Sequence, residues 1–255
     1  GTSFAIAALP CLFLRKPDVP WPLLIAISST LFLGQFLAQA FAIAHGVPVG
    51  LSSVVVQSQA LFTIAFAAIA FGEMPTRPQA IGVAIAALGL LMICGTVGYD
   101  FSVNAFAILM ICPVSFAIGN LLLRQARAAP MFDLFAWLCL CAAVPLAVLT
   151  LISNGPQATW QALSHMSLTG FVCVLCLGGI STSIAYWLWG RLLRDHPAAQ
   201  VVPFALLVPF VGSAASSIVF GERFGPLRLA GMVTVIGGIA VMLLSKRPKA
   251  LPKVA

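Results

Sequence analysis

One stretch of this chain occurs twice. Residues 48–93 recur as residues 197–242 at a constant offset of 149 positions, without a gap. Eight positions are identical at this offset, and four of them are glycine or proline, the residue types most closely tied to backbone conformation. Each copy therefore predicts two apolar segments joined by a short polar turn, and the chain contains an internal repeat. The identical positions are Pro48, Ala65, Ile69, Phe71, Gly72, Glu73, Gly82 and Gly89, which match Pro197, Ala214, Ile218, Phe220, Gly221, Glu222, Gly231 and Gly238.

The composition indicates a membrane protein. Hydrophobic residues make up 61% of the chain and charged residues only 7%, whereas soluble domains carry about 25% charged residues. The net charge of +7 does not indicate a nucleic-acid partner, because the basic residues lie in the gaps between apolar runs and form no basic block. We therefore expect an all-α polytopic protein whose partner is the lipid bilayer.

Proline, glycine and charged clusters divide the chain into nine apolar segments, and a membrane-spanning helix needs about 20 such residues. The first segment is short and resembles the end of a helix, without the features of a signal peptide. We therefore expect ten helices in the complete fold, of which the first is missing from this chain. The predicted spans cover residues 1–14, 21–45, 49–71, 77–97, 103–127, 131–153, 167–193, 197–220 and 225–246.

These spans predict two repeats of five helices. Residues 1–98 form the first repeat, as helices 2–5 of the full fold, and residues 103–246 form the second, as helices 6–10. Residues 247–255 form a basic tail. Because each repeat has an odd number of spans, the two copies enter the membrane in opposite directions, which is typical of alternating-access transporters with a substrate site near the middle of the bilayer.

The basic residues predict the orientation. If the loops alternate between two sides of the membrane, eleven of the 13 Lys and Arg residues fall on one side and two on the other. The positive-inside rule makes the richer side cytoplasmic, so we expect a cytoplasmic C-terminus. The eleven are Arg15, Lys16, Arg77, Arg124, Arg127, Arg191, Arg194, Lys246, Arg247, Lys249 and Lys253, and the two are Arg223 and Arg228.

Polar and deep aromatic residues inside the spans are the candidate substrate contacts, because an unpartnered polar side chain is costly in hydrocarbon. Ser and Thr can instead bond to their own helix, and Gln and Asn can hold helices together. No acidic or basic residue lies at mid-depth in these spans, which favours a small neutral or zwitterionic substrate. The candidates are Gln35, Gln59, Thr63, Ser115, Asn120, Trp137, Ser183 and Tyr186.

Proline and glycine residues predict where helices bend and where they pack closely. Pro203 and Pro209 should kink the eighth span and could serve as a gate or as a fixed bend. Small residues let helices approach closely, so we expect close packing at Gly82, Gly89, Gly231, Gly237 and Gly238. We expect a monomer, with a dimer through these glycines as the alternative. Glu73 and Glu222 should mark helix ends, and the seven cysteines lack partners at metal-ligand spacing, so neither metal nor cofactor is expected.

With these residues in view, the chain resembles the EamA-type members of the drug/metabolite transporter superfamily, in particular the O-acetylserine/cysteine exporter branch. The resemblance spans essentially the whole chain and is carried by GLSSVVVQSQALFTIAFAAIAFGE at 50–73, SFAIGN at 115–120 and VVPFALLVPFVGSAASSIVFGER at 201–223. It implies two inverted five-helix repeats and the export of amino acids or related metabolites across a bacterial inner membrane. An aromatic or broad amino-acid exporter of the same family is the close competitor.

Two other functions remain as alternatives. A drug or nucleotide-sugar transporter of the same superfamily would need a mid-membrane carboxylate or cavity-facing basic residues, and neither occurs in these spans. A membrane-embedded enzyme would need a nucleophile with a base, or a metal set. His45, His165 and His196 lie at segment ends or in a loop, where spacing builds no such constellation. We therefore expect a transporter and not an enzyme.

Overall fold

The computed structural model describes residues 1–72, 74–95, 102–126, 129–184, 188, 207–222 and 224–244. All regular structure in these residues is helical. The helices are α1 (Thr2–Ala7), η1 (Leu9–Leu12), α2 (Trp21–Ser28), η2 (Ser29–Leu33), α3 (Gly34–Ala44), α4 (Val49–Gln57), α5 (Gln59–Phe71), α6 (Arg77–Cys94), α7 (Val103–Leu109), α8 (Ile111–Leu123), η3 (Arg124–Ala126), α9 (Met131–Ser164), α10 (Leu168–Leu175), η4 (Cys176–Ile184), α13 (Leu207–Phe220) and α14 (Pro226–Leu244).

The chain divides into two compact units. The first unit comprises residues 1–34 and 118–196, and the second comprises residues 35–117 and 197–255. Each unit therefore contains segments from both predicted repeats, and the boundaries fall inside α3 and α8. Packing thus groups the helices differently from the sequence duplication, and the repeat boundaries at 1–98 and 103–246 stay a prediction.

Five described helical stretches are long and apolar enough to cross a membrane: Trp21–Ala44, Val49–Phe71, Arg77–Cys94, Val103–Ala126 and Met131–Ser164. Three further apolar helices are shorter, at Leu168–Thr182, Val211–Phe220 and Pro226–Met242. The predicted seventh and eighth spans run partly outside the described residues, and the first consists of the short helices α1 and η1. The all-helical membrane class is thus confirmed, while the count of nine spans stays a prediction.

The sixth predicted span differs in its end. It was expected to stop at residue 153, but helical structure continues to Ser164 after an interruption at Gly155, whose φ is 78° and ψ 158°. Pro156 follows directly and suits the first turn of a new helix, since its missing N–H would have no partner there. The segment expected as a loop therefore carries a short second helix.

The repeated Gly-Glu corners end two helices in the same way. Gly72 follows α5 with φ 65°, and Gly221 follows α13 with φ 66°. This left-handed conformation costs glycine least, and it stops a helix. After the first corner, the Thr76 side chain accepts from the Gln79 N–H and the Gln79 side chain accepts from the Thr76 N–H, which starts α6 with a capping box. The predicted helix end at Gly221–Glu222 is confirmed, whereas Glu73 lies outside the described residues.

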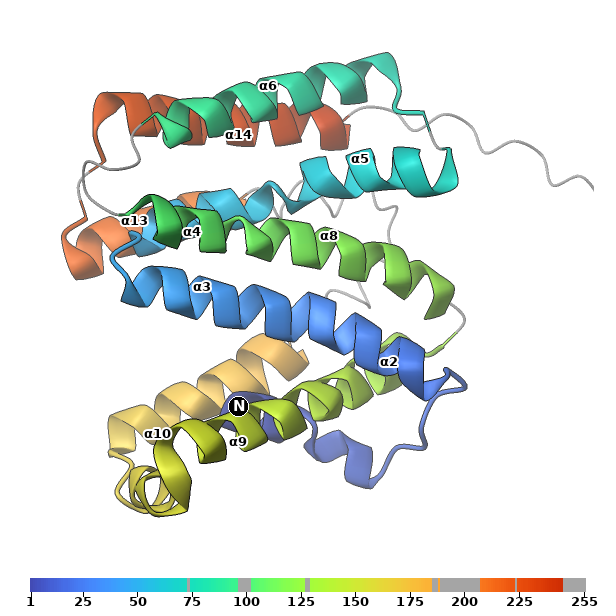
Figure 1. Ribbon diagram of the computed structural model, residues 1–255, viewed down its shortest axis with the longest axis vertical. Helices are drawn as coiled ribbons and strands as arrows, with labels where there is room; N and C mark the ends of the chain where they lie inside the picture. The colour runs from blue at the N-terminus through green and yellow to red at the C-terminus, as the bar shows by residue number, and fades with distance from the viewer. Residues whose placement is uncertain are drawn as a thin grey trace, which may run out of the picture. The chain divides into compact units, whose positions relative to one another are not determined.

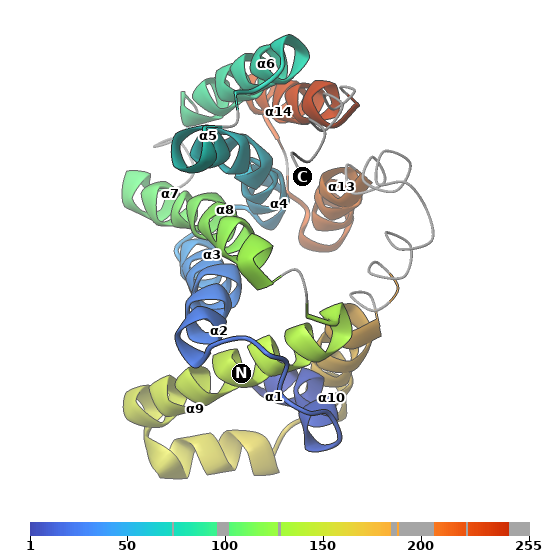
Figure 2. The ribbon, with the colours of Figure 1, turned by 90° about the vertical axis from the view of Figure 1, so that its right-hand side faces the viewer.

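Helices α6 and α14 pack side by side in the second unit (Figures 1 and 2). A Cβ atom added to Gly82 would lie 2.6 Å from the Gly238 carbonyl oxygen, and one added to Gly89 would lie 2.8 Å from that of Gly231. Because residue numbers rise along one helix as they fall along the other, the helices are antiparallel. Under the offset of 149, Gly82 becomes Gly231 and Gly238 becomes Gly89, so the two contacts are equivalent by the repeat.

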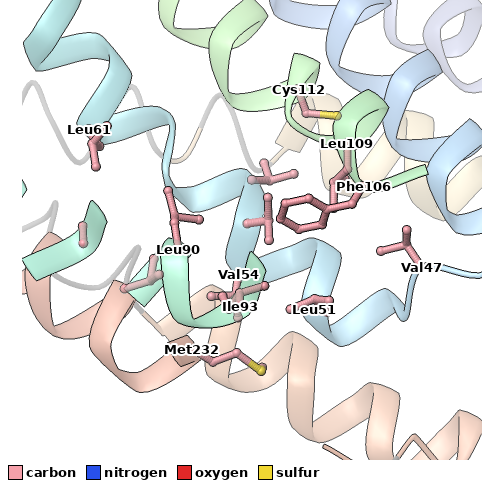
Figure 3. Close-up of a cluster of buried hydrophobic side chains, with 14 of the residues drawn as sticks. Val47, Leu51, Val54, Leu61, Leu90, Ile93, Phe106, Leu109, Cys112 and Met232 are labelled. Atoms are coloured by element: carbon pink, nitrogen blue, oxygen red, sulfur yellow. The ribbon is translucent and has the colours of Figure 1, made fainter. Parts of the chain in front are cut away.

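The predicted close packing therefore holds at four of the five glycines, between helices of one chain. Gly237 differs, because an added Cβ atom would meet nothing within 4 Å. Around this crossing lies the buried core of the second unit (Figure 3). Leu51 and Val54 of α4, Ile93 of α6 and Leu109 of α7 contribute fully buried side chains to it.

The first unit packs α1 against α9, α10 and η4, and α2 against α9 (Figure 2). Two polar contacts support this packing: the Ser28 hydroxyl donates to the Leu138 carbonyl at 2.7 Å, and the Ser3 hydroxyl donates to the Val174 carbonyl at 3.4 Å. Hydrogen bonds between membrane helices contribute about 0.6–2 kcal/mol each.

Two π-helical segments interrupt this unit at matching positions. Segment η2 spans Ser29–Leu33, and the offset of 149 carries it to residues 178–182, inside η4 at Cys176–Ile184. The two sequences, STLFL and GGIST, are not alike. The same offset therefore relates two π-helical segments with different sequences, and π-helical turns occur frequently at functional sites.

Candidate functional site

Three of the predicted contact residues carry a buried polar atom without a hydrogen-bond partner in the described part of the chain. These atoms are Oε1 of Gln35, Oε1 of Gln59 and Nε1 of Trp137. Leaving a buried polar atom unpaired costs about 1–3 kcal/mol. Such an atom is retained where something else, such as a solute or a water molecule, can bind to it. Gln35 and Gln59 belong to the second unit and Trp137 to the first.

Gln35 contrasts with Gln39, one helical turn further along α3. The Gln39 amide donates to the Ser52 hydroxyl at 3.0 Å and so ties α3 to α4, where Ser52 is fully buried. The backbone carbonyl of Gln35 accepts from the Cys112 thiol at 3.2 Å, but its side-chain oxygen is unpaired. Two glutamines on one helix face therefore do different things: Gln39 holds helices together, and Gln35 offers a free acceptor.

A break in the third predicted span positions Gln59. Helix α4 ends at Gln57 and α5 begins at Gln59, because Ser58 has a ψ of −7° and its N–H bonds to the Val55 carbonyl three residues back. The Ser58 hydroxyl is buried and donates to the same carbonyl at 2.6 Å. The break places Gln59 in the first turn of α5 with its amide oxygen buried and unpaired.

The other polar candidates are engaged. The Thr63 hydroxyl donates to the Gln59 carbonyl at 2.7 Å, which is the bond to its own helix that the sequence left open as the alternative. Ser115 and Asn120 lie in α8 and both have interaction partners. Ser115 belongs to the second unit and Asn120 to the first. Their roles as substrate contacts stay predictions.

Trp137 lies near the start of α9 against the first residue of α2. Its ring meets that of Trp21 edge to face at a centroid distance of 5.8 Å. The Lys16 ammonium lies 5.5 Å from the centre of the Trp21 ring, within the range of a cation–π interaction. The ring of Trp137 is thus fixed by packing, which leaves its buried N–H as a donor of defined direction.

The remaining candidates fall wholly or partly outside the described residues. Tyr186 and Pro203 lie outside them. The backbones of Ser183 and Pro209 belong to η4 and α13, but their side chains are not described. The substrate role of Ser183 and Tyr186 and the gating role of the two prolines therefore stay predictions.

One polar contact in the second unit, between Glu222 and the start of α4, was not predicted from the sequence. Glu222 accepts from the Val49 and Gly50 N–H groups at the start of α4, at 2.6 and 3.0 Å. The buried Ser216 hydroxyl also accepts from Gly50, at 3.1 Å. The repeat singled out Glu222, but only as a helix end, because a contact between residues 173 positions apart leaves no local pattern.

Arg228 is the second residue whose position the sequence did not reveal. It lies in the first turn of α14, is only 4% exposed and has an interaction partner. A charged side chain is seldom this buried without such a partner. From the sequence, Arg228 was predicted only as one of the two basic residues on the side of the membrane that is poor in them.

The buried polar atoms without partners in the second unit are hydrogen-bond acceptors. The amide oxygens of Gln35 and Gln59 can each accept an N–H or O–H donor from a solute. Among the described residues, no group of three or more His, Cys, Asp and Glu side chains could hold a metal ion.

Comparison with known proteins identifies the family. The model of the EamA-like transporter family matches residues 104–244. The chain is 30% identical to a protein of Salmonella typhimurium named "Probable amino-acid metabolite efflux pump", across 100% of the chain and 88% of that protein. A protein of the same name from Escherichia coli (strain K12) is also 30% identical, across 100% of the chain and 87% of that protein.

A solved structure, described only as the crystal structure of a protein, has the same fold. It aligns with a TM-score of 0.64 and 18% sequence identity over 94% of this chain and 84% of that one. The predicted resemblance is confirmed by the family match, which covers more than half of the chain, and by relatives aligned over its whole length. This multi-pass membrane protein belongs to the EamA-like transporter family, within the drug/metabolite transporter superfamily.

Proposed function

We propose that this protein exports amino acids or related small metabolites from the cytoplasm by alternating access, as a secondary active transporter. The observation that carries the proposal is the pair of unpaired, buried amide oxygens of Gln35 and Gln59. Amino acids carry an ammonium group, which donates strong hydrogen bonds that amide oxygens can accept. The similar proteins named as amino-acid metabolite efflux pumps support the same substrate class.

The substrate is proposed to be neutral or zwitterionic. A fixed carboxylate would be expected opposite a permanently cationic drug, and a basic residue opposite the phosphates of a nucleotide sugar. The predicted spans contain no acidic or basic residue at mid-depth, and Gln35 lies close to that depth. Amide acceptors without a formal charge suit a solute whose own charges cancel.

The antiparallel crossing of two repeat-matched helices supports the alternating-access part of the proposal. The repeat-matched helices α6 and α14 are antiparallel, and their two glycine contacts interchange under the offset of 149. A pair of equivalent helices related in this way supports two five-helix repeats that cross the membrane in opposite directions, as in a ten-helix fold of this superfamily. Such repeats can exchange conformations, which would move the opening of one site from one face to the other.

The proposed location is a bacterial inner membrane with the C-terminus in the cytoplasm. Eleven of 13 Lys and Arg residues on one side of the predicted topology support this orientation. Glu222 binds the start of α4, so the corner at 221–224 and the turn at 46–48 lie at the same end of the second unit. The alternating loops predict this coincidence, because both turns are assigned to the side poor in basic residues.

Counterflow in liposomes tests the substrate. Liposomes that contain the protein and are loaded with an unlabelled amino acid should accumulate the labelled form from outside, for neutral amino acids in a panel that includes cysteine and phenylalanine. Gln59→Leu should reduce the rate about tenfold, the equivalent of one strong hydrogen bond, without lowering the unfolding temperature. A cationic drug and a nucleotide sugar belong in the same panel. If the protein moves no amino acid, the exporter proposal fails, and uptake of the drug or the nucleotide sugar would favour the alternative.

Impermeant thiol reagents test the orientation. Arg77→Cys should react only from the cytoplasmic side, and Pro226→Cys only from the opposite side. The same protein without the added cysteine supplies the background from its seven native cysteines. Reaction of both positions from one side would contradict the inverted repeat.

A further inference from the structure

Glu222 joins two helices that meet at one end of the second unit. It follows Gly221 at the end of α13, and its two carboxylate oxygens accept separately from the N–H groups of Val49 and Gly50. These are the first two residues of α4, whose N-cap is Pro48 and supplies no capping side chain. The first N–H groups of a helix lack partners within it and attract negative charge. A distant residue therefore caps α4.

The same end of α4 is held by two serines of α13. The Ser216 hydroxyl accepts from the Gly50 N–H at 3.1 Å, and the Ser213 hydroxyl donates to the Gly50 carbonyl at 3.4 Å. A Cβ atom on Gly50 would lie 2.7 Å from Phe224 Cζ and 3.2 Å from Ser213 Cα. Gly50 is thus bound through both its N–H and its carbonyl, and a larger residue there would have to displace the Phe224 ring and crowd the α13 backbone.

Below this contact, α4 and α13 remain close through small residues. A Cβ atom on Gly212 would lie 3.0 Å from the Ser53 hydroxyl oxygen, one turn further into α4. The bonds that join the two helices are polar, and hydration or a new partner can replace a polar bond without breaking either helix. In addition, Ser58 with its ψ of −7° separates α4 from α5 at the other end of α4.

We propose that Glu222 is a latch. Its bonds to the Val49 and Gly50 N–H groups hold the first turn of α4 against α13 and close this end of the second unit, and their release opens it. The inference rests on the proposed exporter function only for its place in a transport cycle. A carrier must close one end while the other is open, so a contact that closes an end has to be reversible. A carboxylate on two backbone N–H groups meets this need, because it binds strongly but leaves both helices intact when released.

The latch is tested by reactivity of a cysteine placed beneath it. Ser53→Cys puts a thiol between α4 and α13, where the closed latch should shield it from an impermeant maleimide in liposomes. Adding Glu222→Ala should accelerate labelling about tenfold, because charge-assisted bonds to two N–H groups are lost. Glu222→Gln keeps the chain length and one carbonyl acceptor, so labelling should be intermediate. Protein without Ser53→Cys supplies the background.

A second cysteine separates a latch from general loosening. Thr234→Cys lies at the crossing of α14 and α6, where the native hydroxyl is 4.0 Å from the Met92 sulfur. Its labelling should not change in either Glu222 variant. The latch is overturned if Ser53→Cys reacts equally fast with and without Glu222, or if both cysteines accelerate alike, because Glu222 would then be an ordinary structural cap. Should Glu222→Ala fail to fold, Glu222→Gln decides by the same criteria.

Transport supplies the last readout. In counterflow, Glu222→Ala should turn over about tenfold more slowly per folded molecule, since a carrier that cannot hold one end closed rarely completes its cycle. An unchanged turnover with accelerated labelling would contradict the latch as a step of transport. Labelling requires no substrate, so a failure of the exporter proposal would show as absent counterflow in the unaltered protein and would leave the labelling result intact.

Discussion

Two helix crossings in the second unit each join a helix of the first repeat to a helix of the second, but by opposite means. Helices α6 and α14 touch backbone to backbone at Gly82, Gly89, Gly231 and Gly238. Helices α4 and α13 are joined instead by serine hydroxyls and the Glu222 carboxylate, which bond to the backbone of Val49 and Gly50. Both pairs appear in Figure 2.

The α6–α14 crossing should be rigid and is called the brace below; the α4–α13 crossing should be able to change and is called the joint. Close glycine contacts gain their stability from dispersion over matching surfaces, and a small displacement loses many such contacts at once. A few polar bonds can be exchanged for other polar partners with less loss. The α6–α14 crossing should therefore remain intact through transport, while the α4–α13 crossing can change.

The largest effect should come from filling the brace. Gly238→Ala would put a methyl group 2.6 Å from the Gly82 carbonyl oxygen, and both atoms belong to rigid helices. We expect a loss of about 3 kcal/mol in unfolding free energy, at the upper end for overpacking, because backbone cannot move aside as a side chain can. Thermal unfolding in detergent measures it.

Gly237→Ala is the matched control, one residue away. An added Cβ atom there meets nothing within 4 Å, so stability should stay within about 0.5 kcal/mol. Equal unfolding temperatures for the two variants would refute the brace.

The next effect distinguishes polar atoms that hold the fold from those left for solute. Gln39→Leu would strand the buried Ser52 hydroxyl and should cost about 1–3 kcal/mol. Gln35→Leu removes an unpaired oxygen and should leave stability unchanged or raised. Its expected loss is in counterflow at low solute concentration, about fivefold to tenfold. The proposal for Gln35 would be wrong if its variant unfolded earlier and transported normally.

Trimming the joint should have a smaller effect. Ser216→Ala removes one of two acceptors on the Gly50 N–H while Glu222 keeps the other, so we expect a loss of about 1 kcal/mol. Ser217→Ala, at the exposed neighbouring position, is the control and should be neutral. A loss from Ser216→Ala as large as that from Gly238→Ala would remove the contrast between the two crossings.

The smallest effect is expected at Trp137, in the first unit. Trp137→Phe keeps an aromatic ring against Trp21 and removes only the unpaired N–H. Stability should change by less than about 1 kcal/mol. If the N–H binds solute, the half-saturation concentration should rise about threefold to tenfold at an unchanged maximal rate. A changed maximal rate alone would contradict a binding role.

Much of the fold follows from local chemistry and was predictable. Long apolar runs predicted the helical membrane class, and the repeated glycines predicted the corners at Gly72 and Gly221 and the close packing of Gly82 with its equivalents. The break at Ser58, the short helix after Gly155 and the π-helical segments were not predicted. They depend on hydrogen-bond choices that differ by little energy, and packing decides between them.

In the candidate site, too, the sequence predicted some residues, and packing decided the roles of others. Seeking polar atoms in apolar runs led to Gln35, Gln59 and Trp137, which do carry unpaired atoms, and also to Thr63, which bonds to its own helix. The sequence places Gln35 nearer to mid-depth than Gln39, but helix periodicity does not show which of the two is hydrogen-bonded, because both occupy the same face of α3. The distinction arises from Ser52 on a neighbouring helix.

The sequence by itself determined that this protein is a helical membrane protein with an internal repeat and the family to which it belongs, because hydrophobicity and glycine act through the nearest residues. Only the tertiary structure decided which polar groups are free and which are tied. Glu222 became more than a helix end only when α13 brought it to the start of α4. A hydrogen bond between residues so far apart depends on where the chain returns, and local preferences carry no record of that.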